Sequence, residues 1–278
     1  MTIKSIFLAL LVEEAELPIS AVRFAMDFAG REEAHLKVGL GAPKFEAMTG
    51  FLMSEVRGML NEVNARRFER AGKFAEEIQT LSVASGVAQT SEIIHAPYYD
   101  VRDRLVRLAR VSDIAILTRT DEVNPAERDI AEDVLFNAGR PLMMIPPSPE
   151  QRGPFAKIVV AWDGGARAAR AVGDAMPLLA QASSIEVVSV SGDPGKSRRV
   201  EGAEIAQHLS RHCNSVSTTE IPPLDGSIGA ALRNHMSLTK ADLLVMGGYA
   251  HSRLRQTVLG GVTDEMLSAA PFPLFMSY

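Results

Sequence analysis

The chain has 278 residues, a formal net charge of −5 and a hydrophobic content of 46%. This length favours two domains of about 140 residues each over a single one. The acidic balance gives no support for a nucleic-acid partner, and no apolar run approaches the roughly 18 residues of a membrane span. We therefore expect neither nucleic acid nor a membrane as a partner.

The cysteine content and the N-terminus favour the cytoplasm. Cys213 is the single cysteine and cannot form an intrachain disulfide, which suits a reducing compartment. Lys4 precedes the apolar run 6–12, as in a secretory signal, but three glutamates follow within residues 13–16 and no small-residue cleavage site of the usual kind is present. We interpret residues 3–12 as a buried first strand.

Residues 1–147 alternate short apolar runs with longer amphipathic stretches, which predicts strands alternating with helices. The expected strands are 3–12, 35–41, 91–95, 113–117 and 142–145. The expected helices are 18–30, 54–85, 100–110 and 124–137. Gly86 is a stop signal for the longest of these helices, and the four prolines within residues 146–154 predict a linker.

The same alternation begins again after the linker. The expected strands are 157–162, 184–190, 215–221, 242–246 and 274–276. The expected helices are 166–180, 198–212, 227–238 and 260–270. Strands that alternate with helices predict parallel sheets with helices on both faces and right-handed crossover connections.

Two segments of the first half match two of the second half. SDIAIL at 112–117 matches ADLLVM at 241–246, and RPLMM at 140–144 matches FPLFM at 272–276. Between the matched segments the first half has a shorter loop without glycine, followed by a helix start, and this region carries Asp121, Glu122 and Glu127. Because carboxylates repel phosphate, we expect the first half to be a degenerate copy that does not bind ATP.

The stretch 241–278 is the most informative part of the sequence. An apolar run leads into Gly247 and Gly248, a basic loop follows at 251–255, and a second glycine pair at 260–261 opens a helix. Glycine lets a backbone approach a phosphate closely, and the first N–H groups of a helix have no intrahelical partner. The arrangement is typical of an anion-binding site.

This stretch resembles the C-terminal signature of the universal stress protein family, which is Gly, two residues, Gly, nine residues, Gly, then Ser or Thr. Gly247 and Gly260 occupy the first and third glycine positions. Ala250 stands at the second glycine position, and Gly261 stands where the family has Ser or Thr. The match to the family is therefore clear, whereas the match to its nucleotide site is partial.

The resemblance implies an α/β fold of two tandem flavodoxin-like domains of the adenine nucleotide alpha hydrolase-like kind, at 1–147 and 155–278. Each domain would be a five-stranded parallel sheet with helices on both faces. The halves would pair through the strands 142–145 and 274–276 as an intrachain pseudo-dimer. The resemblance is also compatible with a homodimer.

In family members that bind ATP, the glycine loop holds the phosphates and ribose, and an Asp at the end of the first strand contacts the adenosine part. The resemblance therefore implies these nucleotide-binding residues: Asp163, Gly247, Gly248, Ala250, Ser252, Arg253, Gly260, Gly261 and Val262. The alternative for Asp163 is capping of the next helix. The alternative for the basic loop, including His251 and Arg255, is a solvated surface or a salt bridge across a dimer.

Three other patterns have weaker interpretations. Residues 192–197, GDPGKS, are similar to a P-loop, but Val190 replaces its first glycine, so a turn is favoured. His208 and His212 have metal-binding spacing on a helix, but no third ligand completes a motif. In the segment 95–100, the side chains of His95, Tyr98 and Tyr99 either line a pocket for a ligand other than ATP or pack at an ordinary helix entry. No metal is predicted beyond the Mg²⁺ that accompanies a bound nucleotide.

No Ser-His-Asp arrangement or pair of carboxylates stands out, so no catalytic residue is predicted. We expect a stress-response regulatory or binding protein with ATP or a related adenine nucleotide in its second half. The alternatives are a scaffold or partner-interaction protein without nucleotide, and a slow ATPase.

Overall fold

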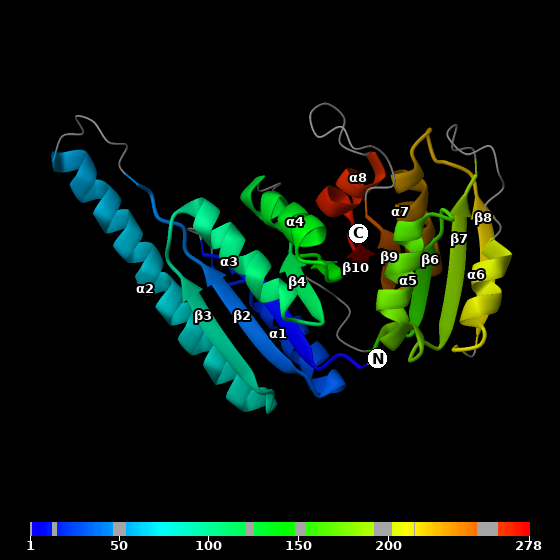
Figure 1. The fold of residues 1–278 in the computed structure, drawn as a ribbon, viewed down its shortest axis with the longest axis horizontal. Helices are drawn as coiled ribbons and strands as arrows, with labels where there is room; N and C mark the ends of the chain where they lie inside the picture. Colours follow the sequence, from blue (N-terminus) through cyan, green and yellow to red (C-terminus); the bar gives the residue numbers. More distant parts are fainter. Residues whose placement is uncertain are drawn as a thin grey trace. The chain divides into compact units, whose positions relative to one another are not determined.

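The computed structural model describes residues 2–12, 16–46, 54–119, 125–147, 154–191, 202–213, 215–248 and 261–278. Strands and helices alternate along the chain (Figure 1). Contacts between residues divide it into two compact units. The first unit comprises residues 3–118 and 125–140, and the second comprises residues 141–278 with the short segments 1–2 and 119–124.

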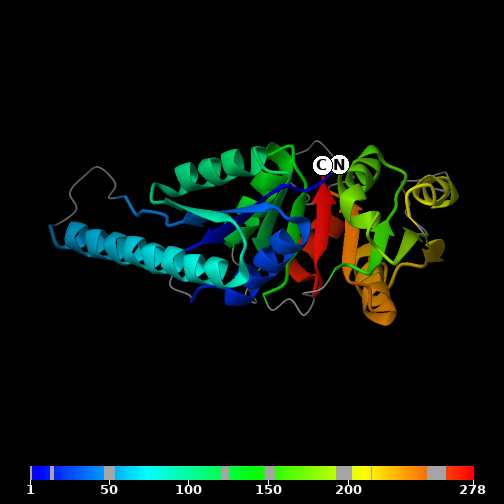
Figure 2. The same cartoon turned by 90° about the horizontal axis from the view of Figure 1, so that it is seen from below.

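The first unit contains four parallel strands in the order β3-β2-β1-β4. Its elements are β1 (Ser5–Leu11), α1 (Ile19–Glu32), β2 (His35–Gly41), α2 (Ser54–Ser85), β3 (Gln89–Ile94), α3 (Tyr98–Arg110), β4 (Ile114–Thr118) and α4 (Pro125–Asn137). Helices α1 and α2 pack together, as do α3 and α4, and the two pairs cover opposite faces of the strands (Figure 2). The central strand β1 is buried on both faces, as its continuous apolar run requires.

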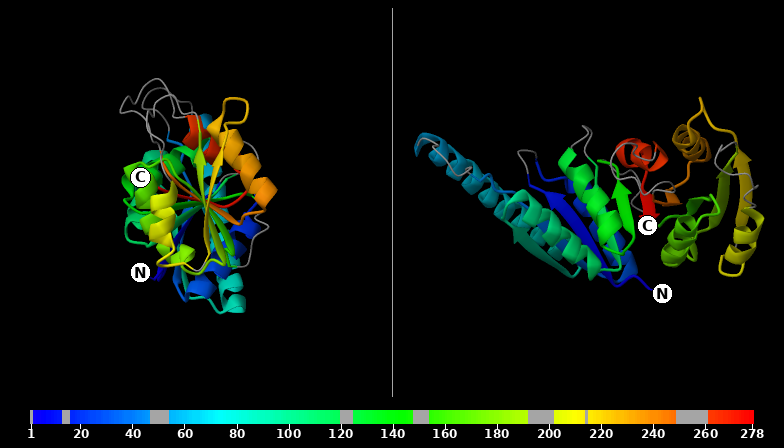
Figure 3. Two further views of the ribbon diagram at one scale, coloured as in Figure 1. Left: turned by 90° about the vertical axis from the view of Figure 1, so that its right-hand side faces the viewer. Right: turned by 45° about the horizontal axis from the view of Figure 1, so that its top comes forward.

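The second unit has the strand order β5-β10-β9-β6-β7-β8, in which β5 is antiparallel to β10 and the other pairs are parallel. Its elements are β5 (Leu142–Ile145), β6 (Lys157–Ala161), α5 (Ala166–Leu179), β7 (Ser184–Val190), α6 (Gly202–Leu209), β8 (Val216–Ile221), α7 (Ile228–Thr239), β9 (Leu243–Gly247), α8 (Gly261–Ala269) and β10 (Leu274–Ser277). Helix α5 packs over β9 and β10, and α7 packs against α8. Helix α6 lies beside the edge strand β8 (Figure 3).

The predicted α/β class, with parallel strands and helices on both faces, is confirmed. Strand β5 belongs to the second unit because Leu142, Met143 and Met144 pair with β10. The predicted boundaries, 1–147 and 155–278, and the pseudo-dimer stay predictions. No helix among the described residues has the length and hydropathy needed to cross a membrane.

Helices α1 and α2 are each followed by a residue with positive φ. Helix α2 ends at Ser85, and Gly86 follows with φ +69°, as a glycine stop predicts. Helix α1 continues two residues past the expected stop at Gly30. It ends at Glu32, and the C-cap residue Glu33 adopts φ +49° and donates its backbone N–H to the carbonyls of Ala29 and Gly30. The capping geometry therefore forms at a non-glycine residue, which sequence reasoning does not anticipate.

A half-buried polar network joins β7, β8 and α7. Glu186 accepts a hydrogen bond from Thr219 Oγ1 (2.5 Å) and lies 3.0 Å from His235 Nε2. Burial raises the pKa of Glu186, but hydrogen bonds from Thr219 and His235, with the charges of His235 and Lys157, outweigh it and leave the pKa below its ordinary value. The ionised carboxylate is therefore the form that the fold stabilises.

We predict that Glu186→Gln makes the protein less stable at pH 7, by about 1–3 kcal/mol, because it weakens charge-assisted hydrogen bonds. A carboxyl whose folded pKa is depressed stabilises the fold above its unfolded pKa, about 4.3, and this stabilisation is lost as pH falls through the folded pKa. The gap between wild type and variant should therefore shrink below about pH 4.

Urea unfolding followed by the fluorescence of Trp162, the single tryptophan, measures this gap at pH 7 and pH 3. Glu62→Gln is the control, because Glu62 is exposed and its one ion pair within the described residues is with Arg66 on the same helix; it should leave the unfolding midpoint unchanged. An equal gap at both pH values would contradict the prediction.

Candidate nucleotide site

The carboxyl ends of β6 and β9 lie side by side in the second unit. Ile158, Val159 and Val160 pair in parallel with Leu243, Leu244 and Val245. Asp163 follows the end of β6 by two residues, and Gly247 is the last residue of β9. The chain leaves β6 towards β7 on one side, whereas β9 and β10 lie on the other. Ligands of open α/β sheets bind outside such a divergence of connections.

Asp163 shapes the turn between β6 and α5. Its Oδ1 accepts a hydrogen bond from Gly165 N at 2.8 Å. Gly164 adopts φ +72°, a conformation that favours glycine. The carboxylate therefore folds back over the turn that precedes α5. This matches the capping alternative in part, although the bond goes to the turn rather than to the first helical residues.

Gly247 lies against the backbone of the first turn of α5. A Cβ on Gly247 would lie 2.6 Å from Ala168 N and 2.7 Å from Arg167 C, closer than real Cβ atoms come. Backbone atoms at a helix start cannot shift without disturbing the helix. The absence of a side chain at this position is therefore required by packing, independently of any ligand.

The remaining described residues of the motif lie at two neighbouring points. Gly248 is buried and donates its N–H to the carbonyl of Ser277 at 2.8 Å, which extends the pairing of β9 with β10. Gly261 opens α8 and is exposed, and a Cβ there would meet no atom of the described residues within 4 Å. Val262 is half-buried in the same turn. The predicted Ala250, Ser252, Arg253 and Gly260 lie outside the described residues, as do His251, Arg255 and the segment 192–197.

Helix α8 is held in place by one carboxylate. Glu265 accepts a hydrogen bond from Ser227 Oγ at 2.9 Å and forms an ion pair with Arg233 at 2.5 Å. Ser227 also caps α7 by accepting from Ala230 N. This cluster fixes the first turn of α8 against the start of α7.

Three residues at the same edge were not predicted from sequence. Arg167 stands in the first turn of α5, and its guanidinium lies 4.3 Å from the ring centroid of Tyr278. Ser277 ends β10 in register with Gly247 and is 2% exposed. Arg167 follows Asp163 by four residues, and its place just after the strand end is a signal that could have drawn attention to it.

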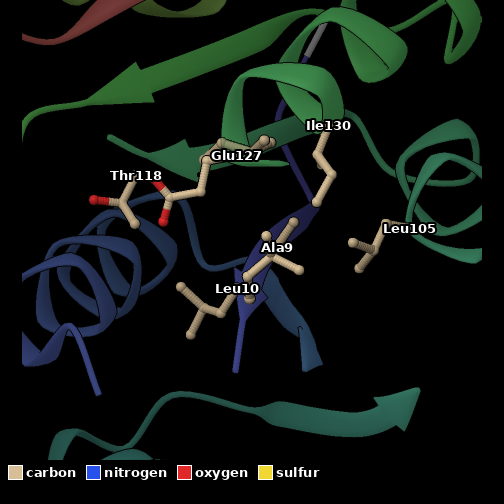
Figure 4. Close-up of a pocket in the computed structure, with 8 residues that line it drawn as sticks. Ala9, Leu10, Leu105, Thr118, Glu127 and Ile130 are labelled. Atoms are coloured by element: carbon tan, nitrogen blue, oxygen red, sulfur yellow. The ribbon is translucent and has the colours of Figure 1, made fainter. Parts of the chain in front are cut away.

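The corresponding edge of the first unit has a small pocket with one carboxylate in its wall. The carboxyl ends of β1 and β4, with α3 and α4, line a pocket of about 10 Å³, room for a single water molecule. Its walls are mainly apolar, and Glu127 in the first turn of α4 lies beside Thr118 (Figure 4). The lining residues are Ala9, Leu10, Leu11, Leu105, Leu117, Thr118, Glu127 and Ile130.

Two further groups of residues were singled out from the sequence, one around His95 and one around His208. His95 Nδ1 lies 2.8 Å from the Ala42 carbonyl, Tyr98 donates its hydroxyl to the Ala126 carbonyl, and Tyr99 is 79% exposed. The rings of Tyr98 and Tyr99 lie 6.2 Å apart, whereas the ring of His95 lies 5.1 Å from that of Phe68. The rings of His208 and His212 lie 5.2 Å apart, and within the described ranges no group of three His, Cys, Asp or Glu side chains has metal-binding geometry.

A family model matches part of the sequence, and solved structures match the fold. The profile of the Universal stress protein family matches residues 154–277, and no curated protein sequence matches the chain. A universal stress protein from Archaeoglobus fulgidus DSM 4304 has a similar structure, with a TM-score of 0.70 and 16% identity over 98% of this chain and 97% of that one. A putative universal stress protein from Pseudomonas aeruginosa UCBPP-PA14 has a TM-score of 0.57 and 14% identity over 99% and 93%.

The second unit is thus an open α/β domain with a glycine and an aspartate at the ends of adjacent strands. Residues 154–277 belong to the universal stress protein family. The similarity to solved structures shows that the fold of these proteins extends over the length of the chain.

We predict that Gly247→Ala lowers the unfolding free energy by about 1–3 kcal/mol, because the new Cβ displaces the backbone of α5. Urea unfolding followed by Trp162 fluorescence measures the loss. Gly261→Ala is the matched control within the same motif, and its effect should stay within about 0.5 kcal/mol because no atom of the described residues lies within 4 Å of its Cβ position. Equal losses in both variants would contradict the packing argument.

Proposed function

We propose that the second half binds ATP or a related adenine nucleotide outside the carboxyl ends of β6 and β9. The observation that carries this proposal is the placement of Asp163 and Gly247 at the ends of adjacent strands, where the connections diverge. Membership of residues 154–277 in the universal stress protein family supports it. The protein would then act as a stress-response binding or regulatory protein.

In this proposal Asp163 contacts the adenosine part of the nucleotide. Gly248, Gly261 and Val262 border the phosphates together with Ala250, Ser252, Arg253 and Gly260, and Mg²⁺ accompanies the nucleotide. The start of α8 offers backbone N–H groups to the phosphates. The hydrogen bond of Glu265 with Ser227 and its ion pair with Arg233 support this role, because they hold the start of α8 in one position.

We propose that the first half binds no nucleotide. Its corresponding pocket has room for one water molecule only. Glu127 stands in the first turn of α4, where a phosphate would otherwise meet backbone N–H groups. A carboxylate at that place repels a phosphate and interacts favourably with the helix start itself.

The family resemblance also suggests partners and a compartment. We propose that the two halves form an intrachain pseudo-dimer through β5 and β10, whose antiparallel register supports it. A homodimer and a cytoplasmic location complete the proposal, the latter supported by the single cysteine.

A second candidate function is a partner-interaction scaffold without nucleotide. The observation that favours it is the apolar stripe of α2. The stripe is buried at Ala71, Phe74 and Ile78 but continues towards the helix start at Val56 and Met59, which are 38% and 67% exposed. A slow ATPase is a third candidate, and it requires phosphate release above that of a variant with an altered glycine loop.

We predict that ATP binds the full-length protein with measurable heat and changes the fluorescence of Trp162, which directly precedes Asp163. Asp163→Ala should weaken binding about 10-fold or more, because a hydrogen bond to a charged group is lost. Asp174→Ala, which removes a carboxylate paired with Arg170 on α5, is the control and should bind as wild type does. Protein that neither carries nor binds an adenine nucleotide would reject the proposal.

The double substitution Ala250→Gly and Gly261→Ser restores the family motif. A residue at position 250 that can adopt positive φ, and a hydroxyl at the start of α8, should raise ATP affinity several-fold. Calorimetry of the variant beside wild type measures the gain. Unchanged affinity would favour the scaffold over the nucleotide site.

A further inference from the structure

The N-cap residue of α5 supplies no side-chain cap, and the Asp163 carboxylate bonds to Gly165 N, before the helix begins. Gly165 occupies the N-cap position and supplies no side-chain hydrogen bond, and the first turn contains no acidic residue. The first N–H groups of a helix have no partner within the helix. They carry the positive end of the helix dipole, which favours an anion.

A buried hydroxyl without a partner faces this helix start. Ser277 is 2% exposed, and its Oγ makes no hydrogen bond within the described part of the chain. Ser277 is in register with Gly247 on the neighbouring parallel strand, so both residues point to the same face of the sheet. The Cβ position of Gly247 points at Arg167 and Ala168, which places Ser277 on the α5 face as well.

Arg167 adds a guanidinium that no carboxylate neutralises among the described residues. The Cζ atom of Arg167 lies 4.3 Å from the centroid of the Tyr278 ring. A ring face attracts the cation but satisfies none of its five N–H donors. Arg170, one turn further along α5, differs in forming an ion pair with Asp174 at 3.0 Å.

We propose that Arg167, the Ser277 hydroxyl and the first turn of α5 bind the phosphate chain of the nucleotide, with Tyr278 as a positioning residue for Arg167. This inference rests on the proposed function and assigns a recognition element outside the family's glycine motif. A planar donor fork, a hydroxyl and a helix start together suit phosphate oxygens. The site adjoins Gly247, where the glycine loop begins. The Ser277 side chain also supplies a hydroxyl to a motif in which Gly261 replaces the Ser or Thr of the family.

Calorimetric titration of the full-length protein with ATP, adenosine and inorganic tripolyphosphate tests the inference. Arg167→Gln should weaken ATP and tripolyphosphate binding about 10-fold to 100-fold and leave adenosine unchanged, because only the phosphates meet the guanidinium. Arg170→Gln is the matched control on the same helix and should behave as wild type. Tyr278→Phe should retain ATP affinity, whereas Tyr278→Leu should lower it through loss of the aromatic face.

Ser277→Ala separates a binding role from a structural one. Removing a buried hydroxyl that has no partner should raise the Tm by about 2–4 °C, while ATP affinity falls. A lower Tm, or a raised Tm with unchanged affinity, would exclude Ser277 from the site.

The outcomes distinguish this inference from the proposed function. ATP binding that Arg167→Gln leaves unchanged overturns the inference and keeps the nucleotide site. Tripolyphosphate binding that depends on Arg167, without binding of ATP or adenosine, keeps the anion site and overturns the nucleotide proposal. Wild-type protein that binds none of the three ligands overturns both.

Discussion

The close approach of β9 to the first turn of α5 is the constraint on which the rest of the second unit depends. At Gly247 the strand backbone comes so near to Ala168 that a single added carbon would overlap the helix. This contact sets the start of α5 against the sheet. Because β10 runs parallel to β9 and in register with it, the same contact brings Ser277 and Tyr278 to that helix start.

The contact also shows that a glycine in a binding motif can be required by packing instead of by the ligand. Gly247 is explained by helix–strand packing alone, whether or not a ligand binds. Gly261 is different, because no atom of the described residues would meet a side chain there, and family members carry a hydroxyl at this position. A position such as Gly261, where packing does not dictate the residue, therefore says more about ligand binding than a position such as Gly247.

Much of the fold follows from hydrophobic periodicity and stop signals. The strand His35–Gly41, the helix Ser54–Ser85 and the strand Leu142–Ile145 have the bounds expected from sequence. Buried parallel strands read as continuous apolar runs, and Gly86 marks the end of the longest helix. The pairing of β5 with β10 was an expectation from resemblance, and its register places β5 in the second unit.

The candidate site was accessible from sequence only in part. Strand ends locate Asp163 and Gly247 at one edge, because parallel strands finish on the same side of a sheet. The stacking of Arg167 on Tyr278 and the isolation of the Ser277 hydroxyl depend on the register of β10. The bonding of Glu186 to Thr219 and His235 depends in the same way on how β7, β8 and α7 pack. No local pattern reports such long-range contacts.

The central claim is that the second half holds a nucleotide at the edge where Asp163, Gly247 and the start of α5 meet. A crystal structure of the full-length protein grown with ATP tests this most directly. The account predicts adenosine beside Asp163 and phosphate oxygens within hydrogen-bonding distance of Arg167. A nucleotide bound elsewhere on the protein, or none bound at saturating ATP, would contradict it.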